Sequence, residues 1–142
     1  MPLDAVTKSR LDEALARLGL QTGRSDDGDV VVAFENVEVF FILDEGVTTV
    51  RAYWLGIVTG DGELDRLREV VNAFNSEIPL GKVSRVMAPG GMSVEFRHHF
   101  FGKTGVTDEQ LHQMLDLFFQ VAFYVIEGVE AAFPDVYVGG EE

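Results

Sequence analysis

Two acidic segments that contain glycine are the first candidates for ligand chemistry. Residues 60–65 (GDGELD) lie between a predicted strand and a predicted helix, which is where a dinucleotide-binding loop would lie. The third glycine of such a loop is replaced by Asp65, and the charges of Asp61 and Glu63 would repel a pyrophosphate. Residues 26–29 (DDGD) lack the ligand spacing of a calcium-binding loop. We interpret the first segment as a helix start and the second as a turn.

Side chains that bind metals or act as nucleophiles are few. The chain has three histidines, His98, His99 and His112, and no cysteine. His98 and His99 are adjacent in a predicted strand, where neighbouring side chains point to opposite faces, so they cannot hold one ion together. Ser84 and Ser93 lie in predicted strands, outside the G-x-S-x-G turn of a serine nucleophile. We therefore expect a protein that is not an enzyme and has no metal, no cofactor and no catalytic residues.

Two asparagines stand out on the second predicted helix. Asn72 and Asn75 are three residues apart and so share a face, although asparagine is only a modest helix former. Their amides could contact a partner. The preferred alternative is that one or both satisfy backbone groups where this helix meets the next strand.

Positive charge is concentrated in the last three predicted strands. These segments, with their flanking turns, hold five basic residues and one acidic residue, Glu95, whereas the whole chain has a net charge of −13. Strand alternation places Arg97 and His99 on one face of one strand, and Arg51 and Tyr53 on one face of another. We predict that these four side chains share an exposed surface. It could receive an acidic helix or peptide, or it could be a solvated face whose cations offset nearby acidic helices.

Length and composition indicate one globular domain. The 142 residues are 46% hydrophobic and 25% charged, so we expect a single domain over residues 1–142 with a loose tail at about 138–142. The acidic charge disfavours nucleic acid as a partner. No apolar run is long enough to span a membrane, and the first residues do not resemble a signal peptide. We expect a cytoplasmic protein without membrane contacts.

Hydrophobic periodicity predicts the elements that position these residues. Asp61 is the predicted N-cap of the second helix, and Thr107 with Gln110 forms the capping box of the third. Strands occur in hairpin groups, which is typical of an α+β domain, here with a five-stranded, mostly antiparallel sheet and packed helices. The helices are predicted at residues 4–20, 61–78 and 107–133, the strands at 30–34, 37–43, 47–58, 80–88 and 92–101, and a solvated connection at 21–29.

Several short motifs carry a family resemblance. They are residues 72–75 (NAFN), residues 79–82 (PLGK) before a strand, the turn at residues 89–91 (PGG), and a long apolar helix capped by Thr107. With the order of the elements over most of the chain, they make the sequence similar to the YbjN family, whose fold resembles type III secretion chaperones. The resemblance implies a dimeric, non-catalytic interaction protein, labelled a bacterial sensory transduction regulator. It also places residues 64–88 near the dimer axis.

The amount of apolar sequence also favours a dimer. Residues 39–43 (VFFIL) are apolar without interruption, and Leu117, Phe119, Val121 and Phe123 widen the apolar arc of the last helix beyond one face. Either the rest of the chain covers this surplus, or a second subunit does.

The combined interpretation is a regulatory or interaction module that acts as a homodimer and binds a protein or peptide partner. The candidate partner-binding residues are Arg51, Tyr53, Arg97, His99, Asn72 and Asn75. The alternative is a small anionic-ligand-binding protein or an enzyme that uses Arg51, Arg97 and His99. An open sheet face favours the first function, and a concave pocket with converging polar groups favours the second.

Overall fold

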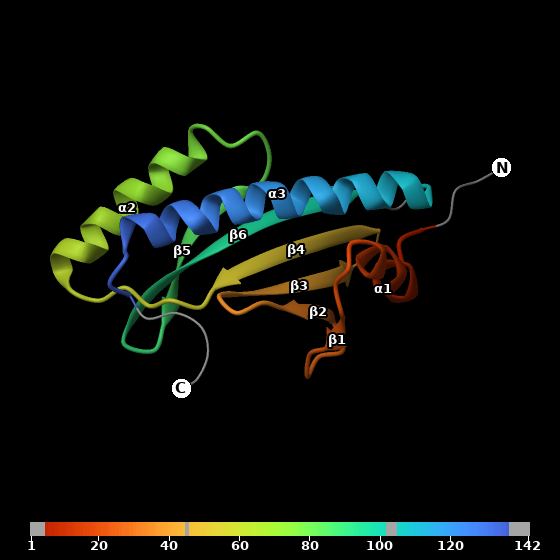
Figure 1. Cartoon of the computed structure of the whole chain (residues 1–142), viewed down its shortest axis with the longest axis horizontal. Coiled ribbons are helices and arrows are strands. Elements are labelled where there is room, and N and C mark those ends of the chain that lie inside the picture. The colour runs from red at the N-terminus through yellow and green to blue at the C-terminus, as the bar shows by residue number, and fades with distance from the viewer. Residues whose placement is uncertain (1–4, 45, 102–104, 137–142) are drawn as a thin grey trace.

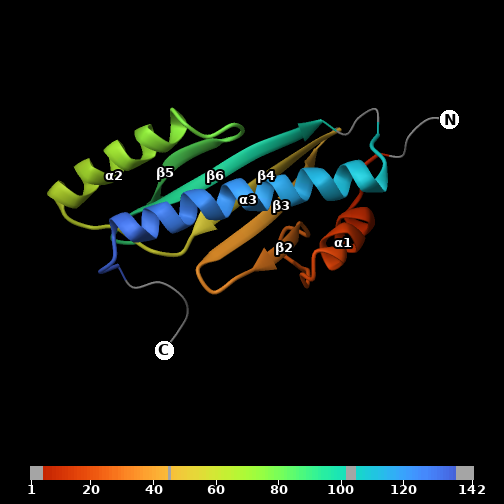
Figure 2. The same cartoon turned by 45° about the horizontal axis from the view of Figure 1, so that its top comes forward.

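Three helices lie on one face of an antiparallel sheet. The computed structural model describes residues 5–44, 46–101 and 105–136. The sheet has the strand order β1-β2-β3-β4-β6-β5. Figures 1 and 2 show α3 crossing the sheet, with α1 and α2 on either side of it. The elements are α1 (Lys8–Arg17), β1 (Gly23–Arg24), β2 (Val30–Ala33), β3 (Val37–Asp44), β4 (Val47–Trp54), α2 (Asp61–Asn75), β5 (Lys82–Ala88), β6 (Gly91–Phe101) and α3 (Asp108–Ala132).

The prediction of an α+β domain is confirmed, but the described sheet has six strands, and the prediction of five was wrong. The additional strand is β1, which lies in the segment predicted as a solvated connection and pairs with β2. An ion pair of 2.8 Å between Arg24 and Asp12 ties β1 to α1. The hydrogen bond from Arg24 lowers the pKa of the Asp12 carboxyl. Two residues are too few to produce a periodic signal, so this strand could not be predicted from alternation.

The helix ends agree only in part with the predicted caps. The capping box of Thr107 and Gln110 is confirmed at the start of α3. Asp61 was wrongly predicted as the N-cap of α2, because Gly60 holds that position and Asp61 is the first helical residue. The Asp61 carboxylate there still interacts favourably with the positive end of the helix. The predicted tail at residues 138–142 lies outside the described residues.

Alternation along the central strand β4 separates a buried face from an open one. In β4, Thr48, Val50, Ala52 and Trp54 are buried toward the helices, while the intervening side chains point to the other face. The strand predicted to reach residue 58 ends at Trp54, and Val58 returns to the sheet as an isolated bridge to Met92.

The wide apolar arc of α3 is mostly covered within the single chain. Phe119 and Val121 are buried, and Phe123 is half-buried with its ring edge-to-face against Phe34. Leu117 and Tyr124 are exposed. The helices and sheet of one chain thus cover most of the widened apolar arc of α3.

Asn75 joins α2 to β5. Its Nδ2 donates to the carbonyl oxygen of Val83 and its Oδ1 accepts from the amide of Val83, both at 2.8 Å. The side-chain amide therefore pairs with β5 as a neighbouring strand would. Asn72 is exposed on α2. Both asparagines lie on α2, but it is Asn75 that pairs with β5.

We expect Asn75→Ala to lower the free energy of unfolding by about 1–2 kcal/mol, because two backbone groups of β5 lose their partner. Asn72→Ala is the matched control and should change it by less than about 0.5 kcal/mol, since alanine is the better helix former and no such pairing is lost. Urea unfolding followed by circular dichroism measures both. Equal destabilisation by the two substitutions would contradict the role of Asn75.

Candidate interaction surface

The sheet face turned away from the helices brings three cations into one line. Arg51 on β4 lies opposite Arg97 on β6, and Arg97 lies opposite Lys82 on β5. We call Lys82, Arg97 and Arg51 the cation row. It runs across three adjacent strands, which are spaced about 4.8 Å apart in an antiparallel sheet. Like charges placed directly opposite each other destabilise a sheet, so this arrangement has an energetic cost.

The Asn75 pairing also indicates how closely the two arginines face each other. Because Val83 directs its N–H and C=O to Asn75, these groups point away from β6. The alternation of an antiparallel pair then directs the backbone groups of Lys82 toward Arg97, and those of Arg97 toward β5. Arg51 and Arg97 consequently form a non-hydrogen-bonded pair, the type in which opposite side chains are closest.

A single buried carboxylate accompanies the row. Glu95 is 4% exposed, and its Oε2 lies 3.3 Å from Nε of Arg51. Arg51 also donates from Nη1 to the hydroxyl of Tyr53 at 3.1 Å. The hydrogen bond to Tyr53, with the charge of Glu95, raises the pKa of Arg51 above its usual value, so the side chain stays charged. Within the described residues, Lys82 and Arg97 have no ion pair.

The remaining predicted site residues are distributed over different surfaces. His99 lies on the same face as the row, with Nδ1 3.0 Å from the hydroxyl of Thr49. His98 points to the helix side, where burial and the charge of His99 lower its pKa. Asn72 and Asn75 lie on α2, away from this face, so the structure does not bring them together with Arg51, Tyr53, Arg97 and His99.

Of the five basic residues counted in these strands, three form the row. Arg85 shares the helix-side face of β5 with Val83, and Lys103 lies outside the described residues. Sequence reasoning did not single out Lys82. The signal was present, because a two-residue Pro89-Gly90 turn aligns Ala88 with Gly91 and thereby Lys82 with Arg97.

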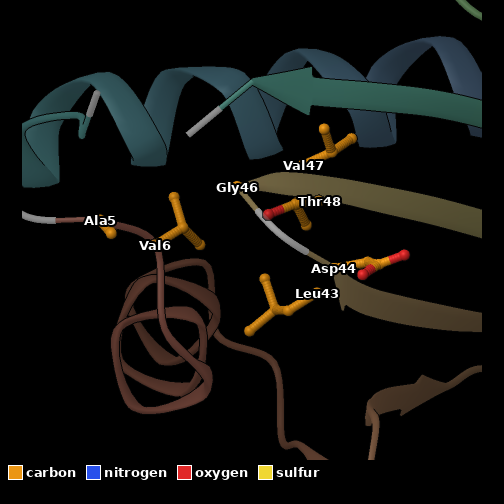
Figure 3. Close-up of a pocket in the computed structure, with 7 residues that line it drawn as sticks. All are labelled: Ala5, Val6, Leu43, Asp44, Gly46, Val47 and Thr48. Carbon is orange, nitrogen blue, oxygen red and sulfur yellow. The ribbon is translucent and has the colours of Figure 1, made fainter. Parts of the chain in front are cut away.

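The concave regions lie elsewhere on the molecule. A hollow of about 150 Å³ separates the segment before α1 from the β3–β4 hairpin, and aliphatic side chains such as Val6 and Leu43 line it (Figure 3). This volume is below that of typical ligand pockets. Across the described residues, no group of three or more His, Asp or Glu side chains is placed to hold a metal ion. In that same part of the chain, no helix is long and apolar enough to cross a membrane.

A larger open cleft of about 590 Å³ lies between residues 57–59, the start of α2 and the end of α3. Arg66 is the basic residue among the described side chains that line this cleft, and it already interacts with neighbouring groups of the same chain. Arg66 pairs with Glu63 at 3.0 Å, donates to the carbonyl of Ala132 and covers the ring of Phe133. Arg66 thus binds the C-terminal end of α3. The residues that line the cleft do not include those of the cation row.

We expect Arg97→Gln to leave the free energy of unfolding unchanged or to raise it by up to about 1 kcal/mol, because it removes a like-charge pair. Arg51→Gln should lower it by about 1–2 kcal/mol, because the buried Glu95 loses its ion-pair partner. Urea unfolding at low and high salt measures both. A larger loss in Arg97→Gln than in Arg51→Gln would show that Arg97 stabilises the fold.

Comparison with known proteins agrees with this fold. Residues 7–130 match the model of the YbjN family, described as "putative bacterial sensory transduction regulator". A search of curated proteins finds no significant match. Among solved structures, the chain is similar to the crystal structure of "YbjN, a putative transcription regulator from E. coli", with 15% identity and a TM-score of 0.76 over 95% of this chain and 98% of that chain. Because the family model covers most of the sequence, the chain belongs to the YbjN family.

Proposed function

We propose that this protein is a non-catalytic regulatory module that binds a protein or peptide partner on the open face of its sheet. The observation that carries this proposal is the cation row, in which three basic side chains lie in line and one of them, Arg51, pairs with a buried carboxylate, in a chain of net charge −13. An arrangement that costs stability in the free protein is expected where a ligand of opposite charge relieves the repulsion. Membership of a family described as regulators supports the regulatory role.

The shape and composition of the face support a macromolecular partner. Arginine and tyrosine are enriched in protein interfaces. Arg51 and Tyr53 lie side by side on this face, joined by a hydrogen bond. The ring of Phe40 packs edge-to-face against that of Tyr53, with 5.7 Å between the ring centroids. The sheet face is open, and the two hollows described above are lined by other residues. We also propose that the domain has a type III secretion chaperone-like fold. The order of its helices and strands supports this assignment.

The close pair of arginines supports one alternative function, the binding of a small anion by Arg51, Arg97 and His99. Small-molecule sites are usually enclosed, with several converging polar groups. Saturable binding of inorganic phosphate at physiological concentration, abolished by Arg97→Gln, would favour this alternative, or an enzyme that uses the anion.

A homodimer is part of the proposed function. Three large apolar side chains are exposed at one end of the sheet, namely Leu55 and Ile57 after β4 and Met87 near the end of β5. Met87 is 89% exposed and lies opposite Met92, which pairs in turn with Val58. Met87 also belongs to the segment 64–88 that the family resemblance places near a dimer axis. This apolar end is therefore the surface that we assign to the second subunit.

Two double variants test the partner-binding face. The row variant, Lys82→Gln with Arg97→Gln, removes two charges from the face, and the control variant, Lys8→Gln with Arg85→Gln, removes two charges from the helix side. In a pull-down from the native host, we expect a stoichiometric partner with the wild type and the control variant, and its loss with the row variant. Binding of the purified partner is then measured directly. A partner that the row variant retains fully would contradict the proposal.

Light scattering after size exclusion tests the dimer. We expect a mass near twice the 15.7 kDa of the monomer at micromolar concentration, and a shift toward the monomer in Met87→Glu, because a charge would be buried at the interface. Gln21→Glu, at an exposed position near β1 at the opposite edge of the sheet, serves as the control. A monomer mass across the whole dilution series would reject the dimer and leave the partner-binding proposal standing.

A further inference from the structure

We infer that the segment received by the open face is an acidic amphipathic α-helix of another protein, lying across the strands with its N-terminal end over β5. This inference rests on the proposed function, because it specifies the partner of that same face. It is carried by the order and spacing of five side chains in one line. They are Lys82, Arg97, Arg51, Phe40 and Val31, contributed by β5, β6, β4, β3 and β2 in that order.

The spacing of the cation row favours a helix over an extended chain. Three adjacent strands place the outer cations about 10 Å apart, at about 4.8 Å per strand. Carboxylates at positions i, i+3 and i+7 of a helix span about 10.5 Å at a rise of 1.5 Å per residue. Three successive side chains on one face of an extended peptide span about 13 Å. One helix face can therefore present one acid to each cation.

The other half of the line determines the remaining chemistry of the helix. Beyond Arg51 the line continues with Phe40, which is half-buried, and then Val31. A helix that follows the line thus needs apolar side chains about one turn after its last acid, near i+10 or i+11 and i+14. The whole line spans about 19 Å, which is the length of about 13 helical residues.

The helix dipole and the cation row together determine which end of the partner helix lies over β5. Acidic side chains are favourable near the N-terminus of a helix, because they interact with the positive end of its dipole. The acids must lie over the cation row, so the N-terminal half lies over β5, β6 and β4. The apolar C-terminal half then lies over β3 and β2. Glu95 stays paired with Arg51, which leaves Arg97 and Lys82 as the cations without an ion pair in the described structure.

The chain's own α2 fits this description less well than a separate protein. Asp61, Asp65 and Glu69 are exposed at spacings of four, so the acids are present. The positions that should be apolar are Asn72 and Ser76, and Arg68 lies 3.7 Å from Asp65. A second copy is therefore an outcome to be distinguished in the test, and the inferred occupant is a helix of a different protein.

Binding of synthetic helices to the full-length protein tests the inference. The probe is a fluorescently labelled, alanine-based 20-residue peptide, locked as a helix by a lactam bridge, with Glu at positions 3, 6 and 10 and Leu at 13 and 17. The first control places the same residues in reversed order. The second replaces two central alanines by proline, which preserves the charge and prevents the helix. Fluorescence anisotropy measures the affinity of each peptide for the wild type, the row variant and the control variant.

We expect the helical probe to bind at least about tenfold more tightly than either control peptide, and the row variant to weaken it by about tenfold or more. The control variant should bind as the wild type does, and affinity should fall as salt rises. Circular dichroism and urea unfolding establish that each variant is folded, and Arg97→Gln alone serves if the row variant is not.

Three results would overturn the inference. Equal binding of the proline peptide would exclude a helix, and equal loss of binding in the control variant would exclude the cation row. Displacement of the probe from the wild type by an excess of the row variant, which keeps α2 but lacks two cations of the row, would identify a second copy as the occupant. Displacement by inorganic phosphate or single-stranded DNA would identify a different ligand class. The proposed function fails separately, when the row variant retains its cellular partner in the pull-down.

Discussion

The packing of α3 against one face of the sheet is the interaction on which the rest of this structure depends. Nine side chains of this helix are buried, and they meet the alternate residues of the central strands, as Phe118 meets Phe96 with ring centroids 5.3 Å apart. Because a strand directs successive side chains to opposite faces, burying one set leaves the other set on the far side. With α1 and α2 on the same side as α3 (Figure 2), none of the helices in the described part of the chain lies over the opposite face.

The register of the strands determines which side chains are neighbours on that open face. Neighbouring side chains in a line across a sheet belong to segments far apart in the sequence, so the line of Lys82, Arg97 and Arg51 exists only once β5, β6 and β4 are paired. Asn75 contributes to this register from the helix side, because its amide holds the outer edge of β5 at Val83.

Much of the fold could be predicted from the sequence, because strong local signals determine it. The capping box at Thr107 and the turn at residues 89–91 fixed the start of α3 and the β5–β6 hairpin. The N-cap of α2 was misassigned, because Gly60 with a φ of 91° can occupy that position without a side-chain bond, and composition favoured the neighbouring Asp61. The strand β1 was missed because two residues carry no period.

The candidate surface was only partly predictable for a different physical reason. Alternation within one strand places Arg97 with His99, and Arg51 with Tyr53, but it does not say which strands are neighbours or how they are aligned. Alternation places Lys82 and Arg85 on opposite faces of β5, and the pairing of β5 with β6 then places Lys82 beside Arg97 on the open face. The dimer argument was weakened similarly, since tertiary packing covers Phe119 and Val121 within one chain.

The buried carboxylate of Glu95 allows a charged row in a stable fold. Glu38 is a second acid on this face, opposite Tyr53, but among the described residues it forms no ion pair with the row. Glu95 neutralises part of the charge of Arg51 from a buried position, so the free protein tolerates the row without cancelling it. A second acid beside Arg97 would stabilise the free protein further but would compete with an incoming carboxylate for the same cation. Among the described residues, Glu95 is the one acid that forms an ion pair with the row, and this leaves the row positively charged. Functional sites typically keep features, such as this charged surface, that lower the stability of the free protein.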